Sequence, residues 1–136
     1  MSLLRRFGAV ALVAAGCLSV ACNGITTPSN NTVDPFSGTL SPGGGVGHFF
    51  TASKTGEYIV KLTALAPTAN ALIGLALVAG NNDGTCTTSV FQQNNFSSLN
   101  VQALGGQIIS GKYCVLVYDV GTITTAQTYT ITVSHP

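Results

Sequence analysis

The cysteines are the residues of this sequence whose positions point to a definite chemistry. Cys22 follows Ser19-Val20-Ala21 at the end of an uncharged, apolar run that begins at Phe7, and a polar stretch starts directly after it. In bacterial export, a thiol placed after small residues at the end of such a run is alkylated by diacylglycerol, and the chain is then cut before it. We therefore expect residues 1–21 to be a lipoprotein signal peptide and Cys22 to be the acylated N-terminus.

The same segment leaves two alternatives open. Cys17 follows Ala14-Ala15-Gly16 and could be the modified residue, and neither cysteine has the preferred Leu three positions before it. We favour Cys22 because the apolar run continues past Cys17. An ordinary secretory signal cut near Ala21 is the other reading, since a basic start and an apolar middle are common to both kinds of signal. The run is too short for a typical spanning helix, which needs about 20 residues.

The two remaining cysteines, Cys86 and Cys114, form an even pair once the signal and the lipid have taken the others. In an oxidising compartment such a pair forms a structural disulfide. A loop of this length stabilises a fold by about 3–3.5 kcal/mol in the chain-entropy model. No CxxC spacing supports a redox role.

Metal and acid–base chemistry find little support. His48 and His135 occur in no zinc-binding spacing, His48 is expected to be a strand residue, and His135, beside the terminal Pro136, is expected to be solvated. A weak calcium site is conceivable from Asn81, Asp83 and Asp119, but calcium usually takes several carboxylates. We interpret Asn81-Asn82-Asp83-Gly84 as a turn. The sequence predicts no catalytic residue, no metal and no cofactor.

Exposed aromatic side chains are a possible platform for sugar stacking. The candidates on outward strand faces are Phe49, Phe91, Phe96 and Tyr118. The chain has no Trp, the commonest stacking residue, and aromatic residues of all-β proteins more often belong to the core.

Charge is scarce, at 7% Asp, Glu, Lys and Arg, against about 25% in typical soluble domains. After the signal the lysines are Lys54, Lys61 and Lys112, and the acids are Asp34, Glu57, Asp83 and Asp119. Such a chain has no basic patch, which argues against nucleic-acid binding. Thr, Ser, Asn, Gln and Gly solvate the surface instead, as suits an exported β-protein.

The elements that must position these residues are short strands. Alternating or apolar runs between Gly-, Pro- and Asn-rich turns predict strands at 36–40, 46–53, 57–64, 71–79, 86–92, 97–104, 113–120 and 128–134, with a brief pairing at 108–109. Gly105-Gly106 is expected to end the strand at 97–104. The expected core is Phe36, Leu40, Phe50, Tyr58, Val60, Leu62, Leu75, Leu77, Leu99, Val101, Val115, Val117, Tyr129, Ile131 and Val133.

About eight strands and no amphipathic helix predict an all-β fold, a jelly-roll-like antiparallel β-sandwich. We expect three parts: the signal at 1–21, a flexible tether at 22–33 that is rich in Thr, Ser and Asn, and the sandwich at 34–136.

Four segments in this order, FSGTLSPGG (36–44), HFF with TGEYIVKLTAL (48–65), GKYCVLVYDVG (111–121) and TYTITVSHP (128–136), resemble the bacterial pre-peptidase C-terminal domain in a single-domain lipoprotein. The resemblance covers about residues 34–136. It implies a small β-sandwich module of the kind attached to secreted proteases, with roles in substrate binding or export and no catalytic residue to carry over.

The function expected from the sequence is therefore that of a non-catalytic binding or structural module, lipid-anchored on the periplasmic or outer surface side of a bacterial membrane. Its partner would be an envelope protein or a polysaccharide. The alternatives are an accessory domain for a secreted protease and a metal-dependent hydrolase. The hydrolase would need His48 gathered with Asp83 or Asp119.

Overall fold

The computed structural model describes residues 28–136, so the predictions for the signal at 1–21, for Cys17 and for Cys22 lie outside the described residues. A single 3-10 turn, η1 (Pro28–Asn30), comes before the strands. The strands are β1 (Thr32–Leu40), β2 (Gly45–Ala52), β3 (Gly56–Ala66), β4 (Ile73–Gly80), β5 (Cys86–Ser97), β6 (Gln102–Ile108), β7 (Gly111–Asp119) and β8 (Gln127–His135). Within 28–136, no helix is long and apolar enough to cross a bilayer.

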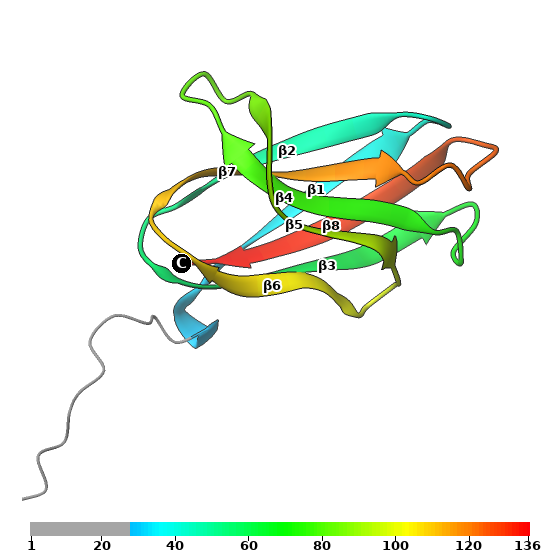
Figure 1. The fold of residues 1–136 in the computed structure, drawn as a ribbon. Coiled ribbons are helices and arrows are strands. Elements are labelled where there is room, and N and C mark those ends of the chain that lie inside the picture. The colour runs from blue at the N-terminus through cyan, green and yellow to red at the C-terminus, as the bar shows by residue number, and fades with distance from the viewer. Residues whose placement is uncertain (1–27) are drawn as a thin grey trace, which may run out of the picture.

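The strands form two four-stranded antiparallel sheets, ordered β1-β8-β3-β6 and β2-β7-β4-β5. Successive strands alternate between the sheets except at the β4–β5 hairpin, as Figure 1 shows. This connectivity is a jelly roll. The predicted fold class is confirmed.

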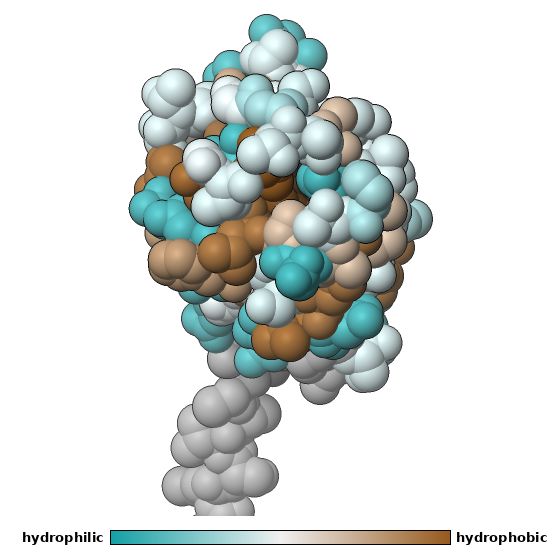
Figure 2. Space-filling model, turned by 90° about the vertical axis from the view of Figure 1, so that its right-hand side faces the viewer, coloured by the Kyte–Doolittle hydropathy of each residue, from teal (hydrophilic) through white to brown (hydrophobic). Residues whose placement is uncertain are grey.

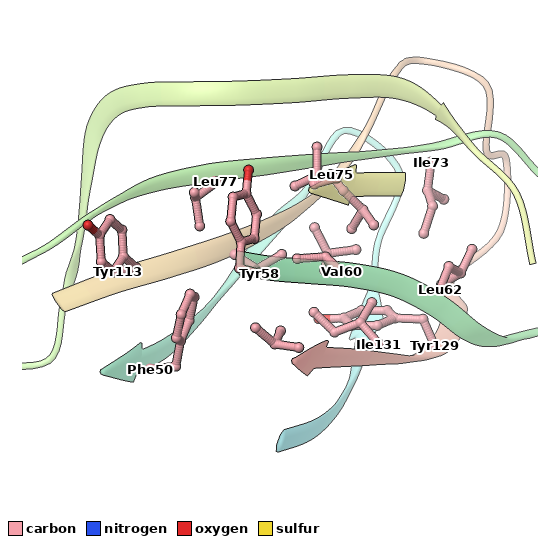
Figure 3. Packing of buried hydrophobic residues seen from close by; sticks show 14 of the residues in the cluster. Phe50, Tyr58, Val60, Leu62, Ile73, Leu75, Leu77, Tyr113, Tyr129 and Ile131 are labelled. Carbon is pink, nitrogen blue, oxygen red and sulfur yellow. The ribbon is translucent and has the colours of Figure 1, made fainter. Parts of the chain in front are cut away.

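The core lies between the sheets and follows from period-two patterns in the strands. In β8, for example, every second residue from Gln127 to His135 is buried, because successive side chains of a strand point to opposite faces. Figure 3 shows Tyr58, Val60 and Leu62 of β3 packed with Leu75 and Leu77 of the facing sheet.

β4 is buried on both faces, which its continuous apolar run predicts. On its outer face, rings from neighbouring strands lie over glycines. A Cβ on Gly74 would come 2.2 Å from the Tyr118 ring, and one on Gly80 would come 2.8 Å from the Phe49 ring. Glycine is required at both positions because the rings occupy the space of a side chain.

The expected strand at 97–104 is wrong. β5 ends at Ser97, and a turn separates it from β6. In that turn Asn100 adopts a φ of 61°, a left-handed conformation that Asn tolerates, and its N–H donates to Leu62 O at 2.7 Å. Val101, expected in the core, is 57% exposed. Gly105-Gly106 does not end a strand but lies inside β6. Glycine does not favour the strand conformation by itself, and pairing with β3 holds these two residues in it.

The boundary expected at Asp34 also falls inside a strand. Thr32 and Val33, placed by the sequence analysis in the tether at 22–33, pair with His135 and Ser134 of β8. The sequence before them, rich in Thr, Ser and Asn, carries no strand pattern. The partner strand is what orders them.

Candidate functional site

A sandwich has two open sides, where the edge strands of its sheets face each other. Here one side lies between β1 and β2, and the other lies between β5 and β6. The first side is closed by rings. Phe36 stacks on His48 with ring centroids 5.1 Å apart, and His48 Nε2 lies 2.7 Å from the Tyr129 hydroxyl.

Farther along the same side, His135 Nε2 pairs with Asp34 Oδ2 at 3.0 Å, and its ring lies 4.9 Å from that of Phe50. His135 is only 5% exposed, so the expectation of a solvated side chain is wrong. The reason is that β8 extends to His135, and its alternation turns this side chain toward the core.

Burial shifts the pKa of both side chains in the His48–Tyr129 hydrogen bond. Burial lowers the pKa of His48 and raises the pKa of Tyr129 to about 12. The imidazole and the phenol are thereby held neutral and hydrogen-bonded to each other. His48 lies within β2, as predicted, and its ring helps to close the side of the sandwich between β1 and β2.

The second side holds a groove of about 430 Å³. Phe91 and Ile109, which are 61% and 67% exposed, are the most exposed apolar side chains among its lining residues. The residues that line it are Tyr58, Leu77, Phe91, Gln92, Gly105, Gly106, Gln107, Ile108, Ile109 and Tyr113. None of these side chains is charged at neutral pH, so the groove is suited to an uncharged ligand.

Phe91 reaches this groove through a β-bulge. Leu77 pairs with Gln92 and Val78 pairs with Val90, which leaves Phe91 as the extra residue of β5. Bulges in edge strands redirect a side chain and frequently lie next to functional sites. The sequence pattern of β5 gives no sign of the bulge.

Tyr113 of β7 contacts both apolar residues. Its hydroxyl donates to Ile109 O at 3.0 Å, and its ring meets that of Phe91 edge-on at 5.8 Å. The same ring stacks on Phe50 in the core at a centroid distance of 5.7 Å. The positions of Phe91 and Ile109 are thereby coupled to the packing of the sandwich.

Two side-chain amides of β5 bridge the sheets on this side of the sandwich, and one of them, that of Gln92, lines the groove. The Oε1 atom of Gln92 accepts hydrogen bonds from the Tyr58 hydroxyl and from Gly105 N at 3.2 Å. The Nδ2 atom of Asn94 donates to Ala103 O at 3.0 Å. Burial raises the pKa of Tyr58, which keeps its hydroxyl a donor. The side chains of β5 thus bind the free backbone edge of β6.

Cys86 and Cys114 form the predicted disulfide, with Cα atoms 5.7 Å apart. It joins the first residue of β5 to the central strand β7, so it holds the strand that carries Phe91 and Gln92 against the sheet.

The calcium candidates are not brought together. Asn81 and Asp83 follow the end of β4 at Gly80, whereas Asp119 pairs with Ile73 at its beginning. The length of β4 separates them by about 23 Å. Residues 28–136 contain no group of three or more His, Cys, Asp and Glu that could hold a metal ion. The hydrolase constellation of His48 with these acids does not form either, since His48 faces Tyr129 inside the sandwich.

Both carboxylates instead stabilise turns. Asp83 accepts from the Thr85 hydroxyl and backbone at 2.6 and 3.0 Å, and these hydrogen bonds lower its pKa. Asp119 accepts from Gly43 N at 2.8 Å and from Gly121 N at 2.8 Å, and the backbone donors, Gly43 first, lower its pKa. Asp119 therefore ties the β1–β2 turn to the loop after β7.

The four candidate aromatic residues do not form one platform. Phe49 lies against Gly80 and Tyr118 against Gly74, which puts these rings at opposite ends of β4, about 20 Å apart. Phe91 turns into the groove. Phe96 is 70% exposed and does not line the groove.

The end of the sandwich shown in Figure 2 carries the turns β1–β2, β3–β4, β5–β6 and β7–β8, with apolar atoms visible between polar loops. A hollow of about 250 Å³ lies at this end between residues 67–72 and 120–126. At its base the amide of Gln127 accepts from Thr68 N at 2.9 Å and donates to Thr125 O at 3.1 Å. Because this amide is satisfied internally and the hollow is smaller, the β5–β6 groove is the stronger candidate site.

No protein-family model and no curated protein sequence matches the chain. Among solved structures, a mitogen derived from Yersinia pseudotuberculosis (YPM) is similar with a TM-score of 0.57 and 14% identity, over 78% of this chain and 87% of that one. PliG, a periplasmic inhibitor of g-type lysozyme from Aeromonas hydrophila, aligns with a TM-score of 0.48 and 13% identity, over 81% of this chain and 91% of that one. The likeness to the mitogen shows the fold alone.

Proposed function

We propose that this chain is an exported, lipid-anchored β-sandwich module of the bacterial cell envelope that binds an uncharged partner in the groove between β5 and β6. Binding is its function and it carries out no catalysis. The likeness to the pre-peptidase C-terminal domain is part of this proposal.

The observation that carries the proposal is the groove itself. Phe91 and Ile109 both expose apolar surface and both contact Tyr113. Bulges that redirect a side chain are over-represented next to functional sites, and ligand sites are concave and mostly apolar. Aromatic side chains that become buried in a pocket are among the residues that contribute most to the free energy of an interface.

Two features support export. The Cys86–Cys114 disulfide requires an oxidising compartment, and the N-terminal segment has the pattern of a lipoprotein signal. Acylation with two or more chains would hold the module on the membrane without a membrane-binding surface of its own.

The binding proposal is tested with the full-length protein in detergent, applied to arrays of neutral envelope oligosaccharides and of uncharged envelope peptides. Phe91→Ala should weaken binding about tenfold or more, as expected for a central aromatic contact. Phe96→Ala is the matched control, because Phe96 is a similarly exposed ring on the same strand outside the groove. Equal binding by the two variants, or no binding to any array member, would refute the proposal.

The anchor is tested by mass spectrometry of the membrane fraction. An acylated Cys22 at the mature N-terminus is the expected result, and Cys22→Ser should release the protein from the membrane. A mature form that starts elsewhere without lipid would remove the anchor but leave the groove proposal intact.

A further inference from the structure

We infer that the groove takes an extended, uncharged peptide segment of a protein partner, which adds to the free edge of β6 by hydrogen bonding to the backbone of Gln107. The inference rests on the proposed function and names the ligand class of the same groove. Addition of a strand to a sheet edge is a common way of binding peptides.

The backbone of β6 shows which groups are free. Gly105 N donates to Gln92 and Ala103 O accepts from Asn94, so residues 103 and 105 direct their backbone groups away from β3. The register between β3 and β6 is regular from Gly105 to Ile108. Because hydrogen-bonding direction alternates along a strand, Gln107 also directs its N–H and C=O away from β3.

An independent contact agrees with this direction. Gln107 is paired in register with Glu57 of β3, and the carbonyl of Glu57 accepts from Asn31 Nδ2 at 2.8 Å. Asn31 comes directly before β1 and also bonds Ser134 of β8 at 3.2 Å, so the Glu57 carbonyl points to the β8 side of β3. Glu57 and Gln107 are therefore a pair that does not exchange backbone hydrogen bonds. Since β6 is an edge strand of its sheet, the outward groups of Gln107 have no strand beside them.

The bridging amides indicate what kind of ligand fits. Asn94 and Gln92 place side-chain amides against Ala103 and Gly105, where a neighbouring strand would place peptide groups. The next position along the same edge is Gln107, and there the groove is open. A peptide group bound at Gln107 would lie in line with the side-chain amides of Asn94 and Gln92 along the edge of β6.

The walls of the groove select the side chains of the peptide. Gln107 is exposed whereas Ile108 is buried, so a peptide residue opposite Gln107 turns its side chain outward. The residues on either side of it turn inward, toward Phe91 and Ile109. Apolar side chains are favoured there because every lining residue is uncharged. The aliphatic Ile109 and the unpaired backbone favour a peptide over a sugar, which would need flat aromatic faces and several convergent polar side chains.

The test uses the peptide acetyl-Thr-Leu-Thr-Leu-Thr-amide with the full-length protein in detergent, measured by calorimetry. N-methylation of the central Thr removes the N–H that faces β6 and should weaken binding about tenfold. N-methylation of either Leu removes an N–H on the far edge and should change binding less than about twofold. Replacement of both Leu residues by Asp should abolish binding.

On the protein, Gln107→Pro removes the free N–H while sparing the β3–β6 ladder, since proline is tolerated where the N–H of an edge strand faces solvent. It should weaken binding about tenfold. Gln107→Ala, the control, keeps the N–H and should bind like the unaltered protein. Unchanged thermal unfolding of both variants confirms that they fold.

Several outcomes would overturn the inference. Equal binding by the two Gln107 variants would do so, as would indifference to the position of the N-methyl group. Phe91-dependent binding of neutral oligosaccharides without peptide binding would also refute it while leaving the proposed function standing. A dimer that Gln107→Pro dissociates would show that the edge pairs with a second copy instead.

Discussion

The sandwich is closed by rings between β1 and β2, whereas between β5 and β6 it is bridged by two amides. On the first side the His48 ring contacts the rings of both Phe36 and Tyr129, and the three lie between the sheets. On the second side the side-chain amides of Gln92 and Asn94 reach across, Gln92 with two hydrogen bonds and Asn94 with one. Aromatic rings fill the gap between two edge strands and exclude water from it, whereas side-chain amides span the gap and leave space beside them. This is why the groove lies between β5 and β6.

The difference extends to the edge strands. Pro35 lies in the middle of edge strand β1, and a proline there blocks the pairing of another strand. β6 has two adjacent glycines instead, and side-chain amides of β5 reach its edge at Ala103 and Gly105. The edge strand β1 therefore carries a residue that blocks pairing with another strand, whereas the edge strand β6 carries no proline.

The largest effect is expected from removing the link between β5 and the central sheet. Replacing both Cys86 and Cys114 by Ser should lower the free energy of unfolding by about 3–3.5 kcal/mol, because the loop of 28 residues is no longer closed. Urea unfolding measures the change, and the reduced unaltered protein is the control, with the same expected midpoint. An unchanged midpoint would show that β5 is held without the disulfide.

The next effect contrasts one ring from each side. Phe36→Ala should lower the free energy of unfolding by about 2 kcal/mol, since the half-buried ring packs on His48 and the core. Phe91→Ala should lower it by less than about 0.5 kcal/mol, since that side chain is largely exposed. Paired urea titrations give both values. Equal losses would mean that the groove side is a packed seam like the other.

A smaller effect is expected from the bridging amide. Gln92→Ala leaves the buried Tyr58 hydroxyl and Gly105 N without a partner, at a loss of about 1 kcal/mol. Gln93→Ala, at an exposed position next to it on the same strand, should have little effect. The amide would have no structural role if thermal unfolding of the two variants coincided.

The last effect is a pH dependence on the ring-closed side. Burial holds the pKa of His48 in the folded protein below its ordinary value of 6.5. At a pH between the folded-state pKa and 6.5, the unfolded chain therefore binds more protons than the folded one. The free energy of unfolding should therefore fall as the pH is lowered from 6.5 toward the folded pKa of His48. His48→Gln should flatten this part of the profile while its amide remains able to bond Tyr129. Identical profiles for the two proteins would place the titration elsewhere.

Much of the fold could be predicted because it depends on local pattern. β3 and β8 alternate clearly and β7 contains an apolar run, and the predicted core residues from Tyr58 to Leu62 and from Tyr129 to Val133 are buried. The prediction failed where pairing overrides local preference. Thr32 and Val33 join β1 because β8 lies beside them. Gly105-Gly106 forms part of a strand because β3 pairs with these residues.

The candidate site could be predicted only in part. Phe91 was identified as an outward aromatic residue, but its separation from Phe49 and Tyr118 depends on a bulge and on two glycines of a different strand. Gln92, Gln107 and Ile109 carry no recognisable motif. Nothing in their spacing along the chain indicates that two edge strands meet there.

The sequence by itself determined the all-β class, the pairing of Cys86 with Cys114 and the lack of charge, because these depend on residue types, their period and their number. Only the tertiary structure decided which sides of the sandwich are closed and which is open. That outcome depends on which strands become edges and on where a bulge turns Phe91, and both are settled by contacts between residues far apart in the chain.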